Sequence, residues 1–115
     1  MSDVRHITVK TVEDFCIATL LDNRIVDDMN IYELGQELFA LVEQSGYKKI
    51  VLNFTNVGFL SSAALGKLIM LYKKVAVRNG SLKLCCIAPD IRELFTMMNL
   101  DRIFTICGTE GEAIA

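Results

Sequence analysis

The sequence predicts an α/β fold in which helices pack against a mixed β-sheet of four to five strands. Two neighbouring extended segments near the start of the chain favour a hairpin, and the segments after them alternate between strand and helix patterns. The chain has 115 residues, of which 52% are hydrophobic and 23% are charged, so it can bury one apolar core. We therefore expect a single domain spanning residues 1–115.

The predicted strands fall into two classes. Apolar and polar side chains alternate over residues 6–12, and residues 15–21 form a second extended run, so these two segments predict the hairpin. Residues 49–54 and 82–87 are short and nearly continuously apolar, which is typical of strands that are buried on both faces. Residues 103–106 predict a last short strand.

Three helices are predicted between these strands. Asn30 is placed as the N-cap of the first helix because Glu33 follows three positions later, and Gly46 ends that helix. The second helix begins at the serine pair 61–62, after which apolar residues recur at helical spacing. Pro89 suits the first position of the third helix, since its missing N–H needs no partner there.

Charge and hydropathy argue against two classes of partner. The formal net charge is -2 and the isoelectric point is near 5.3, so the chain lacks the general attraction to phosphate that nucleic-acid binding uses. No apolar run approaches the roughly 20 residues that a membrane-spanning helix needs, and no secretory signal pattern follows Met1. We therefore expect a cytoplasmic protein with no nucleic-acid partner and no membrane span.

Metal and cofactor sites are not predicted. The four cysteines, Cys16, Cys85, Cys86 and Cys107, lack the C-x-x-C spacing of zinc sites, and we interpret them as buried free thiols. His6 is the sole histidine, so it is interpreted as a surface or strand-edge residue. A disulfide or metal role for the cysteines is the alternative.

The sequence contains no catalytic constellation. It has neither a P-loop glycine pattern nor a G-x-S-x-G elbow, and no acid pair falls where the predicted fold would form a cleft. A small enzyme or a nucleotide-binding protein would need one of these features. We therefore expect no catalytic residues, no cofactor and no enzymatic activity.

Ser61 and Ser62 are the residues best placed to carry a modification, because the second helix is predicted to begin at them. Unpaired backbone N–H groups and the positive end of the helix dipole favour an anion there, so a phosphate on either hydroxyl would be tolerated. Serine is also a preferred N-cap, and a capping role alone explains many serines in this position. The residues alone leave both interpretations open.

Segments spread over the whole chain carry a family resemblance. The strand at residues 50–54 is followed at 57–66 by VGFLSSAALG, which is similar to a strand and Asp-Ser-Ser-Gly-Leu-Gly at a helix start. Further similarities lie at residues 84–89, 94–95, 100–104 and 109–113. In this order and spacing the segments resemble the STAS domain family, and within it the bacterial anti-sigma-factor antagonists. The resemblance implies a STAS-like mixed sheet.

The resemblance also implies a modification site. Ser62 matches the serine that is phosphorylated in anti-sigma-factor antagonists, and Ser61 is the second choice. Two positions depart from the family pattern, since Ser61 stands in place of an acidic residue and Ala64 in place of a glycine. A hydroxyl with a pKa far above neutrality is a poor general base, so Ser61 cannot replace a carboxylate that helps to activate the serine.

The same resemblance predicts a partner-binding surface. The loop holding Arg24, Asp27 and Asp28 is expected near Ser61 and Ser62, and Arg24 is expected to approach Ser62 closely enough to pair with a phosphate. A solvated turn in which an aspartate assists the helix cap is the alternative. Helical spacing separately indicates a stripe on the second helix that is either a docking face or a solvated face: Lys67, Met70, Leu71, Lys74 and Arg78.

The implied function is a phosphorylation-controlled binding switch. Unmodified protein would bind an anti-sigma factor that is also an ATP-dependent serine kinase and so free the sigma factor. Phosphorylation of Ser62 would reverse the binding, and a partner serine phosphatase would restore it. The alternative is a constitutive STAS scaffold subunit of a stress-sensing or lipid-transport complex, in which Ser62 is only a cap; Ser61 in place of the acidic residue favours that alternative.

Overall fold

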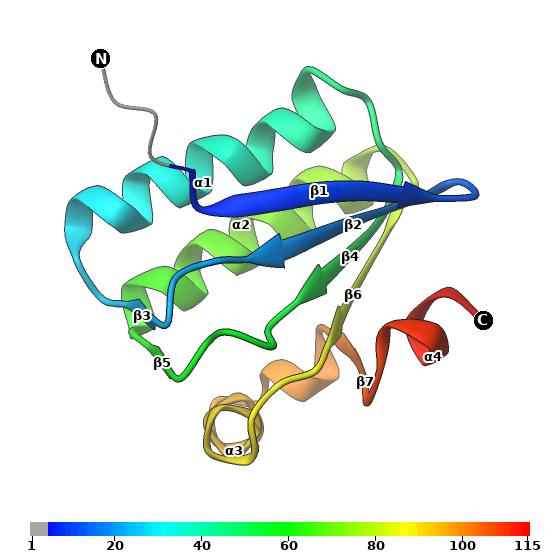
Figure 1. Ribbon diagram of the computed structural model, residues 1–115. Helices are drawn as coiled ribbons and strands as arrows, with labels where there is room; N and C mark the ends of the chain where they lie inside the picture. The colour runs from blue at the N-terminus through cyan, green and yellow to red at the C-terminus, as the bar shows by residue number, and fades with distance from the viewer. Residues whose placement is uncertain (1–4) are drawn as a thin grey trace.

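The computed structural model describes residues 5–115 and has a mixed five-stranded sheet, which confirms the predicted fold class (Figure 1). The strand order is β1-β2-β4-β6-β7, in which β1 pairs with β2 antiparallel and every other neighbouring pair is parallel. The strands are β1 (Ile7–Val12), β2 (Phe15–Leu20), β4 (Lys49–Asn53), β6 (Ser81–Cys85) and β7 (Thr105–Cys107).

Helices cover both faces of this sheet, but unequally. Two long helices, α1 (Asp28–Glu43) and α2 (Ser62–Val77), lie side by side behind the sheet in Figure 1. A shorter helix, α3 (Pro89–Met97), follows β6, and a 3-10 turn, η1 (Leu100–Arg102), leads into β7. The last helix, α4 (Glu110–Ile114), packs against β4, β6 and β7. Parallel strands require such crossover connections, which explains the alternating order.

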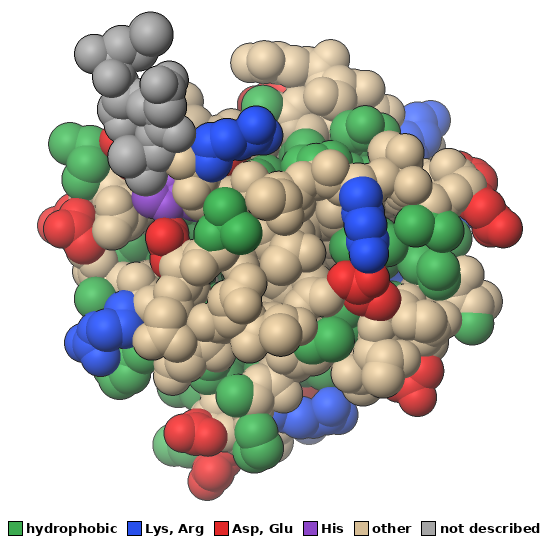
Figure 2. Space-filling model, viewed as in Figure 1, with side chains coloured by type: hydrophobic (Ala, Val, Ile, Leu, Met, Phe, Trp, Pro, Cys, Tyr) green, Lys and Arg blue, Asp and Glu red, His purple; other side chains and the backbone are tan. Residues whose placement is uncertain are grey.

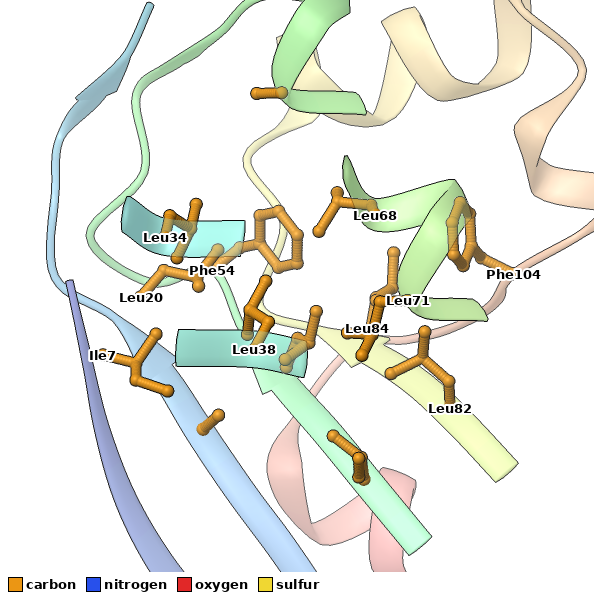
Figure 3. Packing of buried hydrophobic residues seen from close by; sticks show 14 of the residues in the cluster. Ile7, Leu20, Leu34, Leu38, Phe54, Leu68, Leu71, Leu82, Leu84 and Phe104 are labelled. Atoms are coloured by element: carbon orange, nitrogen blue, oxygen red, sulfur yellow. The ribbon is translucent and has the colours of Figure 1, made fainter. Parts of the chain in front are cut away.

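The main apolar core lies between the sheet and the two long helices (Figure 3). Leu38 of α1, Leu68 of α2 and Leu84 of β6 are almost completely buried there. The core extends to α3 through an edge-to-face contact between Phe54 and Phe95, whose ring centroids are 6.3 Å apart. A second, smaller cluster lies on the α4 side of the sheet: Ile17, Val51, Cys85 and Ala113.

Two very short strands form a separate sheet beside the main one. β3 (Arg24–Ile25) precedes α1, β5 (Phe59–Leu60) precedes α2, and the two pair in parallel. Neither strand was predicted, because two residues are too short to show a period. Their pairing joins the two loops that lead into the long helices.

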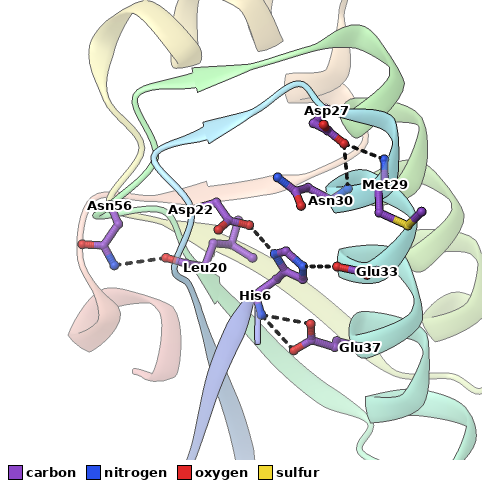
Figure 4. A network of polar contacts seen from close by, with 9 residues as sticks. All are labelled: His6, Leu20, Asp22, Asp27, Met29, Asn30, Glu33, Glu37 and Asn56. Atoms are coloured by element: carbon purple, nitrogen blue, oxygen red, sulfur yellow. Dashed lines mark hydrogen bonds and ion pairs between the residues drawn. The ribbon is translucent and has the colours of Figure 1, made fainter. Parts of the chain in front are cut away.

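The first helix begins earlier than predicted. Its N-cap is Asp27, whose carboxylate accepts hydrogen bonds from the backbone amides of Met29 at 2.8 Å and Asn30 at 3.3 Å (Figure 4). The prediction of Asn30 as the N-cap is therefore wrong. The aspartate satisfies two amides that the helix leaves unpaired, and this is the stronger local choice.

His6 is buried, so its interpretation as a surface residue is wrong, although it directly precedes the edge strand β1. Only 1% of it is exposed, its Nδ1 lies 2.5 Å from Asp22, and its Nε2 lies 2.9 Å from Glu33 (Figure 4). Its backbone N–H donates to the carboxylate of Glu37 at 2.9 and 3.1 Å. Because carboxylates accept, both ring nitrogens can donate only in the protonated imidazolium. This cluster ties the start of β1 to α1.

The surroundings of His6 change its pKa in opposing ways. Burial, the largest influence, lowers the pKa, but hydrogen bonds to Glu33 and Asp22 and the charges of Asp22 and Glu37 outweigh it. The pKa of His6 is therefore raised above its ordinary value of 6.5.

The four cysteines are free, and burial divides them into two pairs. Cys16 and Cys85 are buried, and desolvation raises the pKa of the first to about 11 and that of the second to about 12. Both thiols are consequently protonated and unreactive at neutral pH. Cys86 and Cys107 are half-buried, which corrects the interpretation of all four as buried thiols.

The His6 cluster predicts a dependence of stability on pH. A group whose pKa is higher in the folded than in the unfolded protein stabilises the folded state fully when the pH is below the pKa of the unfolded protein. This stabilisation is lost as the pH rises through the pKa of the folded protein. We expect the free energy of unfolding to fall as the pH rises above about 6.5. In His6→Gln, which cannot titrate, that slope should be flatter. Urea unfolding followed by circular dichroism across this range tests it, and equal slopes in the two proteins would contradict it.

Candidate functional site

The candidate site is the start of α2, where the serine pair lies. Ser61 is the N-cap, since its hydroxyl oxygen accepts a hydrogen bond from the backbone amide of Ala64 at 3.2 Å. Ser62 is the first residue of the helix, and its side chain is exposed. The predicted position of Ser62 in the first turn is confirmed. The suggestion that Ser62 itself caps the helix is wrong, because Ser61 performs that role.

The Ser62 hydroxyl makes no hydrogen bond with any of residues 5–115. The backbone amides of Ser62 and Ala63 likewise have no acceptor within that range, as expected for the first turn of a helix. An exposed hydroxyl, two unpaired N–H groups and the positive end of a 16-residue helix thus meet at one point. The geometry suits an oxyanion carried on Ser62.

Main-chain hydrogen bonds hold the two site loops together. The amide of Ser61 donates to the carbonyl of Ile25 at 3.0 Å, and the amides of Gly58 and Phe59 donate to the carbonyl of Asn23 at 2.8 and 3.0 Å. The side-chain amide of Asn23 in turn donates to the carbonyl of Asn56 at 3.0 Å. The loop before α1 is therefore fixed beside the start of α2.

Arg24 lies on β3, beside the segment that leads to Ser62. Its guanidinium carbon is 5.0 Å from the centroid of the Phe59 ring, within the range of a cation-π contact. Asp27 caps α1, as the alternative interpretation of that loop suggested, while Asp28 is the exposed first residue of the helix. The structure thus brings Arg24, Asp27 and Asp28 to the same end of the molecule as the serine pair.

The predicted stripe on α2 is only partly available to a partner. Leu71 is completely buried, so its place on an exposed docking stripe is wrong. Lys67 and Lys74 lie over the Phe39 ring of α1 at 5.9 and 5.0 Å from its centroid, and Lys74 also forms an ion pair with Glu43 at 2.9 Å. Helical spacing could not show that this stripe borders α1. Met70 is 46% exposed and stays free for contacts.

A groove of about 500 Å³ lies between the start of α2 and α3. Ser61 and Ser62 line one wall of it, and Asp90, Glu93 and Met97 of α3 line the other. Sequence reasoning missed the α3 residues, because they lie about 30 positions from the serines and nothing in the spacing links the two segments. The apolar run that places α3 was the only available signal.

Surface charge on the face shown in Figure 2 is mixed, with Lys and Arg side chains scattered among Asp and Glu. Within residues 5–115, no group of three or more His, Cys, Asp or Glu side chains is arranged to hold a metal ion. Of the helices in this described part, none combines the length and apolar character needed to cross a membrane.

Comparison with known proteins places these features in a family. The model of the STAS domain matches residues 6–113. BtrV of Bordetella bronchiseptica, provisionally named an anti-sigma factor antagonist, is 28% identical over 109 residues, which cover 95% of this chain and 91% of that protein. The crystal structure of TM1081 from Thermotoga maritima, provisionally named likewise, superposes with a TM-score of 0.83 at 27% identity, covering 94% of this chain and 91% of that one.

A more distant structure is that of SpoIIAA from Bacillus in its phosphorylated form. It superposes with a TM-score of 0.71 at 18% identity, over 94% of this chain and 96% of that one, so the likeness shows the fold alone. The family match itself runs from His6 to Ala113 and includes both loops that meet at the start of α2. The resemblance inferred from the sequence is confirmed, and the chain belongs to the STAS domain family.

Proposed function

We propose that this chain is an anti-sigma factor antagonist that binds an anti-sigma factor through the surface around Ser62, and that phosphorylation of Ser62 weakens the binding. The names of BtrV and TM1081 support the class of partner. One observation carries the switch: Ser62 is exposed at the start of a long helix, and its hydroxyl forms no hydrogen bond with residues 5–115.

The two serines have different structural roles, and this difference supports the proposal. Ser61 provides the cap that α2 needs, so Ser62 can be modified without loss of a structural hydrogen bond. A phosphate on Ser62 would lie at the positive end of the helix dipole, which tolerates negative charge. The folded state would therefore survive modification, as a reversible switch requires.

The same phosphate would oppose binding if Ser62 lies within an interface. It would add a charge of about -1.5 to -2 that must lose its water when a partner covers it. Desolvation and crowding of such a group cost several kcal/mol, enough to abolish a moderate affinity. Exposed apolar side chains lie on the first loop, on the first turns of α1 and on β5, which pairs with β3 next to the serine pair, and such side chains favour a protein partner. They are Val26, Met29, Tyr32 and Phe59.

The enzymes of the switch would be partners of this chain. A cytoplasmic anti-sigma factor with serine kinase activity would supply ATP and the catalytic groups, and a serine phosphatase would remove the phosphate. Ser61 stands where the family pattern has an acidic residue, so this chain has no carboxylate at that position to act as a general base. The kinase would therefore have to provide the general base.

A second candidate is a constitutive scaffold subunit without phosphorylation. The observation that favours it is again Ser61 in place of the acidic residue. In that case the surface around Ser62 would bind a partner permanently, and charge at Ser62 would have no regulatory use.

The capping geometry predicts unequal effects of removing each hydroxyl. Ser61→Ala should lower the free energy of unfolding by about 0.5 to 2 kcal/mol, because the amide of Ala64 loses its acceptor. Ser62→Ala should change it by less than about 0.5 kcal/mol, as expected for an exposed residue without contacts. Chemical denaturation of the two variants checks the order, and a larger loss in Ser62→Ala would contradict it.

The switch predicts opposite effects of two substitutions on partner binding. Ser62→Asp should weaken binding to the cognate anti-sigma factor at least about tenfold, or about 1.4 kcal/mol, because it places a charge in the interface. Ser62→Ala should keep near-native affinity and gain no mass when incubated with ATP and the kinase. Calorimetric titration and intact mass measurement test both expectations.

Ser45→Asp is the matched control, since this exposed serine lies beyond the end of α1 and gains the same charge. It should bind like the unchanged protein. If Ser62→Asp and the unchanged protein bind the anti-sigma factor with equal affinity, the proposed phosphorylation switch is wrong and the scaffold function is favoured.

A further inference from the structure

The groove between the start of α2 and α3 has a mainly apolar lining (Figure 1 shows both helices). Its apolar walls are contributed by two segments that are far apart in the sequence. Phe59 is 50% exposed on one wall and Met97 is 74% exposed on the other, so large apolar side chains face solvent at its mouth. Exposed aromatic and methionine side chains around a hollow are typical of a protein-binding surface.

The groove also carries an uncompensated negative charge. Asp90 and Glu93 are the charged residues of its lining, which contains no Lys, Arg or His. Within residues 5–115 neither carboxylate forms an ion pair or accepts a side-chain hydrogen bond. They are three positions apart on α3 and so lie on one helix face, with Met97 a further turn along. The groove thus combines an apolar floor with an acidic rim.

Arg24 forms no ion pair with Asp90 or Glu93. Its guanidinium stacks on the Phe59 ring from β3, and it does not line the groove. Arg92 lies between the two acidic residues in the sequence but is likewise absent from the residues that line the groove. The acidic rim therefore remains available to a cation from outside.

We propose that this groove receives a large apolar side chain of the anti-sigma factor that stands next to a lysine or arginine, and that Asp90 and Glu93 pair with that basic residue. The inference rests on the proposed function and names the chemistry of the partner segment. A volume of about 500 Å³ accommodates a leucine or phenylalanine with its neighbouring backbone. The exposed carboxylates contribute mainly selectivity and association rate, while the apolar contact contributes affinity.

The position of Ser62 on the groove wall connects this surface to the switch. A phosphate on that hydroxyl would occupy the mouth of the groove and keep its water shell, so the apolar side chain of the partner would lose its place. The groove therefore supplies a physical reason for a modification at Ser62 to act on binding.

The test removes the charges of Asp90 and Glu93 while keeping the shapes of the two side chains nearly unchanged. Asp90→Asn combined with Glu93→Gln should weaken binding of the cognate anti-sigma factor about fivefold and reduce its dependence on salt. Asp14→Asn combined with Asp101→Asn is the matched control, because it removes two charges from exposed positions outside the groove. The control should bind like the unchanged protein, and melting curves of both variants verify that they are folded.

A second measurement addresses the groove without the anti-sigma factor. A blocked peptide Arg-Leu-Arg-Phe-Arg at millimolar concentration should shift the methyl NMR signals of Leu65, Ile91 and Met97. The acidic peptide Glu-Leu-Glu-Phe-Glu should not, and the double variant at the rim should no longer distinguish the two peptides. Equal shifts with both peptides, or no shift with either, would overturn the proposed chemistry of the groove.

The two measurements separate failure of this inference from failure of the proposed function. If the anti-sigma factor responds to Ser62→Asp but binds the rim variant as tightly as the unchanged protein, the groove is not its docking site and the inference is overturned. If no anti-sigma factor binds the unchanged protein while the basic peptide alone shifts the groove methyls, the proposed function fails and the groove's preference for an apolar and basic segment stands.

Discussion

The main-chain pairing of β3 with β5 is the constraint on which the candidate site depends. Three hydrogen bonds, from the amides of Gly58, Phe59 and Ser61 to two carbonyls of the first loop, bring together segments about 35 positions apart. Without them the loop before α1 and the start of α2 would be two separate surfaces. The core beneath is formed by α1 and α2 against parallel strands, and it fixes where each helix begins.

Electrostatic contacts at the same end of the molecule reinforce this arrangement. Asp27 caps α1 and Ser61 caps α2, so both helices start at defined residues close to the paired loops. The buried imidazole of His6 connects the start of β1 to α1 and to Asp22, which follows β2. Backbone and side-chain hydrogen bonds thus add to the apolar packing of Ile25, Leu60 and Leu65 at the end of the molecule that carries Ser62.

Much of the fold could be predicted because strand and helix periods extend over many residues. The serine pair was located at a helix start for the same reason, since the apolar spacing of α2 begins immediately after it. Which serine caps could not be predicted, because it depends on a shift of one residue. The burial of His6 depends on carboxylates 16 to 31 positions away, and the acidic rim at Asp90 depends on how α3 packs. Local sequence patterns could therefore predict neither feature.

The hydrogen bonds that pair β3 with β5 use backbone atoms, so the exposed side chains of this region take no part in the pairing. Arg24, Val26 and Phe59 are all exposed, and the hydrogen bonds between the loops use none of their side chains. A substitution at one of these three positions would change the exposed surface without removing a hydrogen bond between the loops. If the proposed function holds, a domain of this kind can change its binding partner through a few surface substitutions, with no change in its core.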